Sequence, residues 1–136
     1  MCDNLITMQI LESTLKVKKS DLDDLNHVNN VHYVQWVQDI AKGHWTQVAT
    51  KEILDHYFWV MINHCIAYKN SALLNDTIHI KTYIKNSKGP ISTRIVEITN
   101  HKTNLLLATS ETKWCLINKK TNRPTRITSE IIGLFS

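Results

Sequence analysis

The chain has 136 residues, of which 43% are hydrophobic and 21% charged, which is typical of one soluble globular domain large enough to bury an apolar core. Only 3 glycines and 2 prolines are present, which excludes Pro-rich low-complexity segments and long flexible linkers. No segment approaches the roughly 18 apolar residues of a membrane span, and the residues after Met1 lack the basic and apolar regions of a secretory signal. We therefore expect one domain over residues 1–136, with no membrane insertion.

The net charge and the cysteines indicate which partners and which cellular compartment to expect. The net charge of +4 and the pI near 9.0 favour anionic partners such as nucleic acids, membrane surfaces and phosphorylated cofactors. No nucleic-acid-binding motif accompanies the charge, so a nucleic acid partner is not expected. The three cysteines, Cys2, Cys65 and Cys115, form no CxxC pair, which predicts free thiols, no metal site and a cytoplasmic location.

A strand, a polar loop and a helix are predicted in the first third of the chain. Residues 7–18 alternate apolar with polar side chains, as strands do, and the polar segment 19–27 indicates a loop. Between Val31 and Trp45, four polar side chains form one narrow stripe, namely His32, Gln35, Asp39 and Lys42, and nearly all other residues are apolar or aromatic. This period predicts a helix that protein surrounds on most sides, with Asn29 or Asn30 as its N-cap.

Strands dominate the remainder. Their alternation, their β-branched and aromatic residues and the turn residues between them predict strands over residues 57–68, 77–85, 92–99 and 105–117, and a short helix over 128–135. One helix with about five antiparallel strands predicts an α+β fold in which a curled sheet wraps around the long central helix. Because so small a sheet leaves exposed edges, which proteins usually cover, we expect a homodimer or a dimer of dimers.

The segment from Ser20 to Asn30 combines three carboxylates, one imidazole and three amides directly before the predicted helix. A helix N-terminus offers unpaired amide donors and the positive end of a dipole, which suit an oxyanion developing on a carbonyl under attack. A nearby carboxylate can act as a general base toward water or attack the carbonyl itself. From spacing alone, the alternative is an acidic surface loop with an Asx cap.

A resemblance favours the chemical interpretation. Asp21-Leu22-Asp23, followed by His27-Val28-Asn29-Asn30 and Tyr33, resembles the signature of hotdog-fold acyl-CoA thioesterases of the 4-hydroxybenzoyl-CoA thioesterase-like group. The His-Val-Asn-Asn form is shared with plant acyl-carrier-protein thioesterases. Weaker similarities follow in the family's order at residues 68–76, 108–114 and 123–124. The resemblance implies a hotdog fold and hydrolysis of acyl-CoA to a free carboxylic acid and CoA.

The resemblance also implies roles for single residues. Asp23 falls on the catalytic carboxylate, and His27 and Asn30 fall at the start of the helix whose amides polarise the thioester carbonyl. The expected substrate-binding residues are Asn29, Val31, Tyr33, Lys88 and Arg94. The last two flank the Gly89-Pro90 turn and are expected to contact the phosphates of CoA.

The chain departs from the plant enzymes at two places. Leu25 stands where they have an active-site Asn, and Ser71 and Ala72 stand where they have Glu and Cys. A simpler arrangement built on Asp23 is therefore favoured, with no cofactor, because water is the second substrate. Two alternatives stay open: an acyl-carrier-protein thioesterase, and a non-enzymatic hotdog subunit that binds an acyl ligand.

Overall fold

The computed structural model describes residues 9–136. Residues 7 and 8 of the predicted first strand, and Cys2, lie outside this part. The elements are β1 (Leu11–Lys16), the 3-10 helix η1 (Lys19–Asp21), α1 (Asn30–Val48), α2 (Lys51–His56), β2 (Tyr57–Tyr68), β3 (Thr77–Lys88), β4 (Ile91–Asn100), β5 (Leu106–Asn118), β6 (Arg123–Pro124) and α3 (Ser129–Leu134). None of the helices described is long and apolar enough to cross a membrane.

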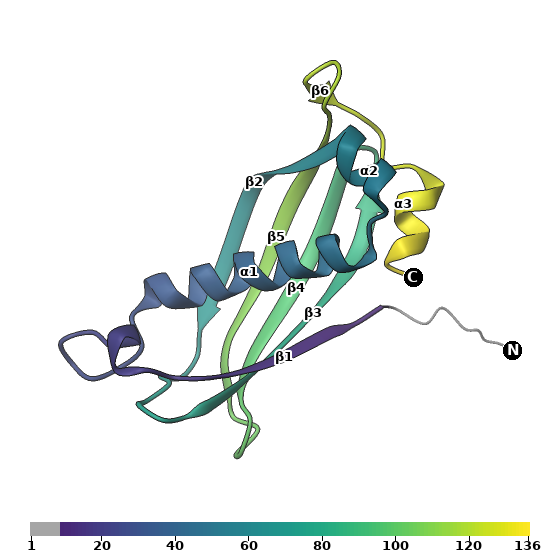
Figure 1. The fold of residues 1–136 in the computed structure, drawn as a ribbon. Helices are drawn as coiled ribbons and strands as arrows, with labels where there is room; N and C mark the ends of the chain where they lie inside the picture. Colours follow the sequence, from purple (N-terminus) through teal and green to yellow (C-terminus); the bar gives the residue numbers. More distant parts are fainter. Residues whose placement is uncertain (1–8) are drawn as a thin grey trace, which may run out of the picture.

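The strands form one antiparallel sheet in the order β1-β3-β4-β5-β2, with the short β6 paired to β5. In Figure 1 this sheet curls around α1, which crosses its concave face, while α2 and α3 lie near the C-terminal end of α1. The expected α+β architecture of the hotdog fold, a curled sheet around one long helix, is confirmed.

The central helix begins at the predicted cap, but it is buried on one face and is not surrounded by protein on most sides, since Gln35, Gln38 and Lys42 are exposed. Asn29 is the N-cap, and its Oδ1 accepts a hydrogen bond from the amide of Val31 at 3.1 Å, which satisfies one of the free donors of the first turn. Its apolar stripe is buried against the sheet through Tyr33, Trp36, Val37, Ile40, Ala41, His44 and Trp45. The helix continues to Val48, three residues beyond the predicted end.

A β-bulge in β2 sets which of its side chains face α1. The pairing with β5 shifts between Met61 and Asn63, so that Ile62 is the extra residue and the alternation of faces changes there. Trp59 before the bulge contacts Trp45 of α1, with ring centroids 5.5 Å apart. Tyr68 after the bulge contacts Tyr33 of α1, with centroids 5.6 Å apart. Odd-numbered residues of β2 therefore face α1 before the bulge, and even-numbered residues face it after the bulge.

The interior divides into two apolar clusters along α1. The larger one packs the first half of α1 on the centre of the sheet, with Tyr33, Val37, Ile78, Val96 and Leu107 among its members. The other packs the second half of α1 against α2, α3 and β5, and consists of Trp45, Ile53, Leu116, Ile127, Ile131 and Phe135. Polar residues and a cavity separate the two clusters.

Candidate active site

The loop before α1 is held by the carboxylate of Asp23. Its Oδ1 accepts hydrogen bonds from the amides of Leu25 at 2.9 Å and His27 at 3.1 Å. The backbone closes the same loop, because the Asp23 amide donates to the carbonyl of His27 at 2.7 Å. Asn26 occupies the turn with a φ of 62°, a conformation that Asn tolerates better than most residues. The other oxygen of Asp23, Oδ2, forms no hydrogen bond within residues 9–136.

A second carboxylate, that of Asp21, joins this loop to the residues on either side. Its Oδ2 accepts from the amide of Lys18 at 2.8 Å, and its Oδ1 lies 3.4 Å from Nδ1 of His32 in the first turn of α1. The Asn29 amide donates to the carbonyl of Asp21 at 2.9 Å. Asp21 therefore fixes how the loop enters the helix.

The start of α1 presents one amide without a partner. The Val31 amide is bound by the side chain of Asn29, and the His32 amide by its carbonyl at 2.9 Å. The Asn30 amide forms no hydrogen bond among the described residues. Five of the eight residues predicted for the site lie together in this loop and first turn, namely Asp23, His27, Asn29, Asn30 and Val31. All of them except the half-buried Asp23 are exposed.

Tyr33, also predicted to bind substrate, lies in the core instead of lining an open surface. It is 2% exposed and packs edge-on against Trp36 at 5.3 Å between ring centroids. Its hydroxyl accepts a hydrogen bond from the Ala72 amide at 3.0 Å. Burial raises the pKa of the Tyr33 phenol above its ordinary value, which keeps the group protonated at neutral pH. Tyr33 thus fastens α1 to the segment after β2.

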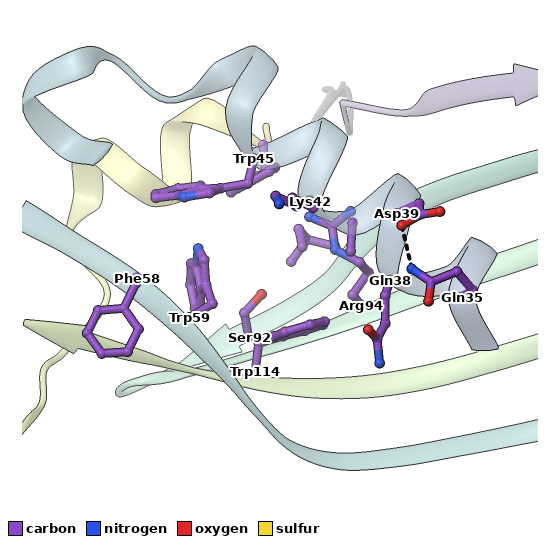
Figure 2. Close-up of a pocket in the computed structure, with 13 residues that line it drawn as sticks. Gln35, Gln38, Asp39, Lys42, Trp45, Phe58, Trp59, Ser92, Arg94 and Trp114 are labelled. Carbon is purple, nitrogen blue, oxygen red and sulfur yellow. Dashed lines mark hydrogen bonds between the residues drawn. The ribbon is translucent and has the colours of Figure 1, made fainter. Parts of the chain in front are cut away.

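A cavity of about 430 Å³ lies between the sheet and the part of α1 from Gln35 to Trp45. Figure 2 shows its aromatic walls, formed by Trp45 of α1, Phe58 and Trp59 of β2 and Trp114 of β5. Its full lining is Gln35, Gln38, Asp39, Ala41, Lys42, Trp45, Phe58, Trp59, Ile84, Ser92, Arg94, Trp114 and Phe135. No residue of the loop before α1 belongs to this lining.

Arg94, predicted together with Lys88 at the turn, points into this cavity. It is 4% exposed, and Figure 2 shows its side chain extending from β4 toward α1. Its Nη1 donates to Nδ1 of His44 at 3.0 Å and to Oγ1 of Thr82 at 2.9 Å. Lys88, in contrast, is exposed at the end of β3, beside the turn at Gly89. The structure does not bring these two predicted residues together.

Burial affects the protonation of both His44 and Arg94. It lowers the pKa of His44 to about 4, with the nearby Arg94 charge as the second cause, so the imidazole is neutral at pH 7 and accepts through Nδ1. Burial also lowers the pKa of Arg94 to about 10, which leaves the guanidinium charged at pH 7. A neutral histidine and a hydroxyl therefore hold a buried cation.

No sequence pattern directly indicates the cavity. Its lining comes from α1, four strands and the C-terminal residues, and residues so distant in sequence show no common spacing. One clue was present: Trp114 shares a strand face with Ala108, Ser110 and Thr112, which predicts that this large ring points toward the helix. Within residues 9–136, no group of three or more potential metal ligands is present.

The architecture is that of the hotdog fold, and a family profile assigns the chain to the thioesterases of this fold. The sequence profile described as "Acyl-ACP thioesterase N-terminal domain" matches residues 9–135, and the chain belongs to this family. No curated protein sequence matches the chain significantly.

Solved structures share the fold at low sequence identity. The probable thioesterase YbaW from Escherichia coli is 21% identical, with a TM-score of 0.79 over 94% of this chain and 96% of that chain. The 1,4-dihydroxy-2-naphthoyl-CoA thioesterase Slr0204 from Synechocystis is 13% identical, with a TM-score of 0.80 over 93% and 95%. The 12:0-ACP thioesterase from Umbellularia californica is 18% identical, with a TM-score of 0.79 over 91% of this chain and 48% of that chain.

Proposed function

We propose that the protein hydrolyses acyl-CoA and that Asp23 is its catalytic carboxylate. One observation carries the proposal: the Oδ1 of Asp23 is held by two amides, whereas its Oδ2 is free and the neighbouring helix begins with a free amide at Asn30. A fixed carboxylate with one unengaged oxygen suits proton abstraction from water or direct attack on a carbonyl carbon.

The reaction needs only these groups and water. When Asp23 acts as base, its Oδ2 takes a proton from water while the water oxygen bonds to the thioester carbon. The carbonyl oxygen gains negative charge, which the Asn30 amide and the positive end of α1 stabilise. The carbon–sulfur bond then breaks, and the CoA thiolate leaves and takes a proton. When Asp23 attacks directly, water hydrolyses the resulting anhydride and restores the carboxylate.

We propose that the site is completed in a homodimer formed through β2. This strand is one edge of the sheet, and it exposes the apolar side chains of Val60 (42%) and Ile62 (53%). The other edge, β1, is half as long and exposes the polar side chains of Glu12, Ser13 and Thr14. A long apolar edge is the one that a second copy can cover with backbone hydrogen bonds.

Antiparallel pairing of two β2 strands would join the catalytic loop to the cavity. Within one chain the loop precedes Asn30, whereas the cavity lining on α1 runs from Gln35 to Trp45, roughly 8 to 22 Å further along a helix that rises 1.5 Å per residue. α1 starts beside Tyr68 at the end of β2 and reaches Trp59 near the start of β2. In a two-fold dimer the end of one β2 lies beside the start of the other, so the Asp23 loop of one protomer meets the cavity of its partner.

Substitution of Asp23 tests the catalytic assignment. Asp23→Asn keeps the side-chain oxygen that holds the loop and removes the base, and we expect a loss in kcat of at least ~10²-fold on a panel of acyl-CoA esters. Asp24→Asn is the matched control, because Asp24 is an exposed neighbour in the same loop, and we expect it to keep wild-type kcat. Full hydrolysis by folded Asp23→Asn protein would refute the assignment.

The second candidate substrate is acyl-carrier protein, which the family description favours. The two candidates are distinguished by measuring kcat/KM for the same acyl group on CoA and on acyl-carrier protein. We expect kcat/KM to be higher for acyl-CoA, with Lys88 contacting the CoA phosphates. A higher value for acyl-carrier protein, falling steeply as salt is added, would replace CoA by the carrier protein. Binding of acyl-CoA without any hydrolysis would instead favour an acyl-binding subunit.

We place this function in the cytoplasm. The two cysteines described, Cys65 and Cys115, are both free thiols, which suits a reducing compartment.

A further inference from the structure

The guanidinium of Arg94 is buried without a negative partner among residues 9–136. All its polar contacts among the described residues are made by Nη1, to His44 and Thr82, and the ring of Phe135 lies 5.4 Å from its central carbon. Nη2 and Nε form no hydrogen bond within residues 9–136. The partners that hold Arg94 are therefore all neutral.

The nearest candidate for a counter-ion is engaged elsewhere. Asp39 is the one acidic residue among those lining the cavity, and its Oδ1 accepts a hydrogen bond from Nε2 of Gln35 at 2.8 Å. Asp39 is exposed, and no ion pair joins it to Arg94 in the described part of the chain. The other cation of the lining, Lys42, adds a second positive charge. A buried charge without a partner is costly, and such a charge facing an open cavity indicates an anionic ligand.

The aromatic walls of the cavity indicate the chemical character of the rest of this ligand. Trp45, Phe58, Trp59 and Trp114 present aromatic surface, which suits an apolar stem, and the buried side chain of Arg94 extends from β4 into the cavity. A ligand that satisfies both features has a hydrophobic chain or ring with an anionic group at the end that enters first. A guanidinium with two free donor nitrogens can bind a carboxylate at two oxygens.

We propose that the preferred substrates are thioesters whose acyl group carries a second carboxylate at the end remote from the thioester, and that this carboxylate binds Arg94. The inference rests on the proposed thioester hydrolysis and names its substrate class. It gives Arg94 a role inside the acyl cavity, in place of the contact with CoA phosphates that its position in the sequence suggested.

Matched pairs of substrates test the proposal. The pairs are hexanoyl-CoA with adipoyl-CoA and octanoyl-CoA with suberoyl-CoA, which differ only in a terminal methyl or carboxylate, and ω-hydroxyhexanoyl-CoA serves as a neutral polar member. For the wild-type protein we expect kcat/KM to be at least ~10-fold higher for the carboxylate member, as a charged hydrogen-bonded pair implies. A preference for the methyl-ended or hydroxyl-ended member would overturn the proposal.

Variants of Arg94 connect the preference to this residue. Arg94→Met should lower the ratio of kcat/KM for adipoyl-CoA over hexanoyl-CoA by at least ~10-fold, and Arg94→Lys should lower it less, because the charge remains but the two-point contact is lost. Arg126→Met is the matched control, since Arg126 is exposed outside the cavity, and it should keep the wild-type ratio. A ratio unchanged in folded Arg94→Met protein would contradict the proposal.

A binding measurement separates this proposal from the proposed function. Calorimetry with Asp23→Asn protein compares the affinities for adipoyl-CoA and hexanoyl-CoA without turnover, and it also decides the case if Arg94→Met does not fold. Tighter binding of adipoyl-CoA supports the inference even for a chain that hydrolyses neither compound, which would refute only the proposed function. Equal or weaker binding of adipoyl-CoA would overturn the inference, whatever the rate of hydrolysis.

Discussion

The two ends of α1 are built on different principles. At its start, the polar loop is held by short local hydrogen bonds, such as those that Asp23 accepts from the amides two and four positions later. At its other end, Trp45 packs on side chains from β2 and the C-terminal residues, which are distant in sequence. The first region carries exposed polar groups, and the second borders a cavity with aromatic walls. The comparison implies that stability and chemistry depend on different ends of one helix.

Loss of Trp45 should have the largest effect on folding. The indole packs edge-on against Trp59 and stacks on Phe135, so Trp45→Ala should lower the free energy of unfolding by about 3–5 kcal/mol. At the other end, Leu25 is 74% exposed, and Leu25→Ala should change it by no more than about 0.5 kcal/mol. Urea denaturation measures both. Similar losses for the two variants would remove the distinction between the ends.

Acid should weaken the cavity end through His44. As pH falls, the unfolded chain protonates this histidine near its ordinary pKa of 6.5, whereas the folded protein resists until about pH 4. The unfolded state then binds more protons, so stability decreases as pH falls through this window.

The variant His44→Asn isolates this contribution, since the Asn oxygen can accept from Arg94 but cannot be protonated. Between pH 7 and pH 4, the wild-type free energy of unfolding should fall by on the order of 2–3 kcal/mol more than that of the variant. Denaturation curves at a series of pH values provide the comparison. Parallel pH profiles would show that His44 is not held neutral by the fold.

The cap of α1 should have the smallest of these effects. Asn29→Ala removes the acceptor for the Val31 amide and should lower the free energy of unfolding by about 1 kcal/mol. Asn29→Ser keeps a capping oxygen and should stay within a few tenths of a kcal/mol of wild type. If the two variants are equally destabilised, then the cap does not stabilise the helix start.

The same contrast explains how much the sequence predicted. The strand over residues 57–68 was found at its observed bounds and Asn29 was one of two residues expected as the cap, because strand alternation and capping depend on neighbours in the chain. The loop around Asp23 was recognised for the same reason, since its residue types lie within one short segment. Local patterns therefore predicted most of the fold and the group of polar residues at the start of the helix.

The cavity could not be predicted because it depends on packing between distant segments. Arg94 was expected to contact phosphates beside Lys88, but it lies on the same face of β4 as the buried Val96 and Ile98, and its side chain lines the cavity. His44 carried no spacing that indicated its pairing with a residue fifty positions later. Such contacts follow from sheet register, which no local pattern contains.

Mixed dimers test most directly whether the two ends meet across a subunit interface. One protomer carries Asp23→Asn, and the other carries Gln38→Trp, which fills the rim of the cavity from an exposed position on α1. Gln47→Trp, outside the lining, serves as the control for the added ring. The two protomers carry different tags, so that the mixed dimer can be purified. It should have about half of the wild-type activity, because one of its two symmetric sites combines an intact Asp23 with an intact cavity. Activity no higher than that of either single variant would contradict the shared site.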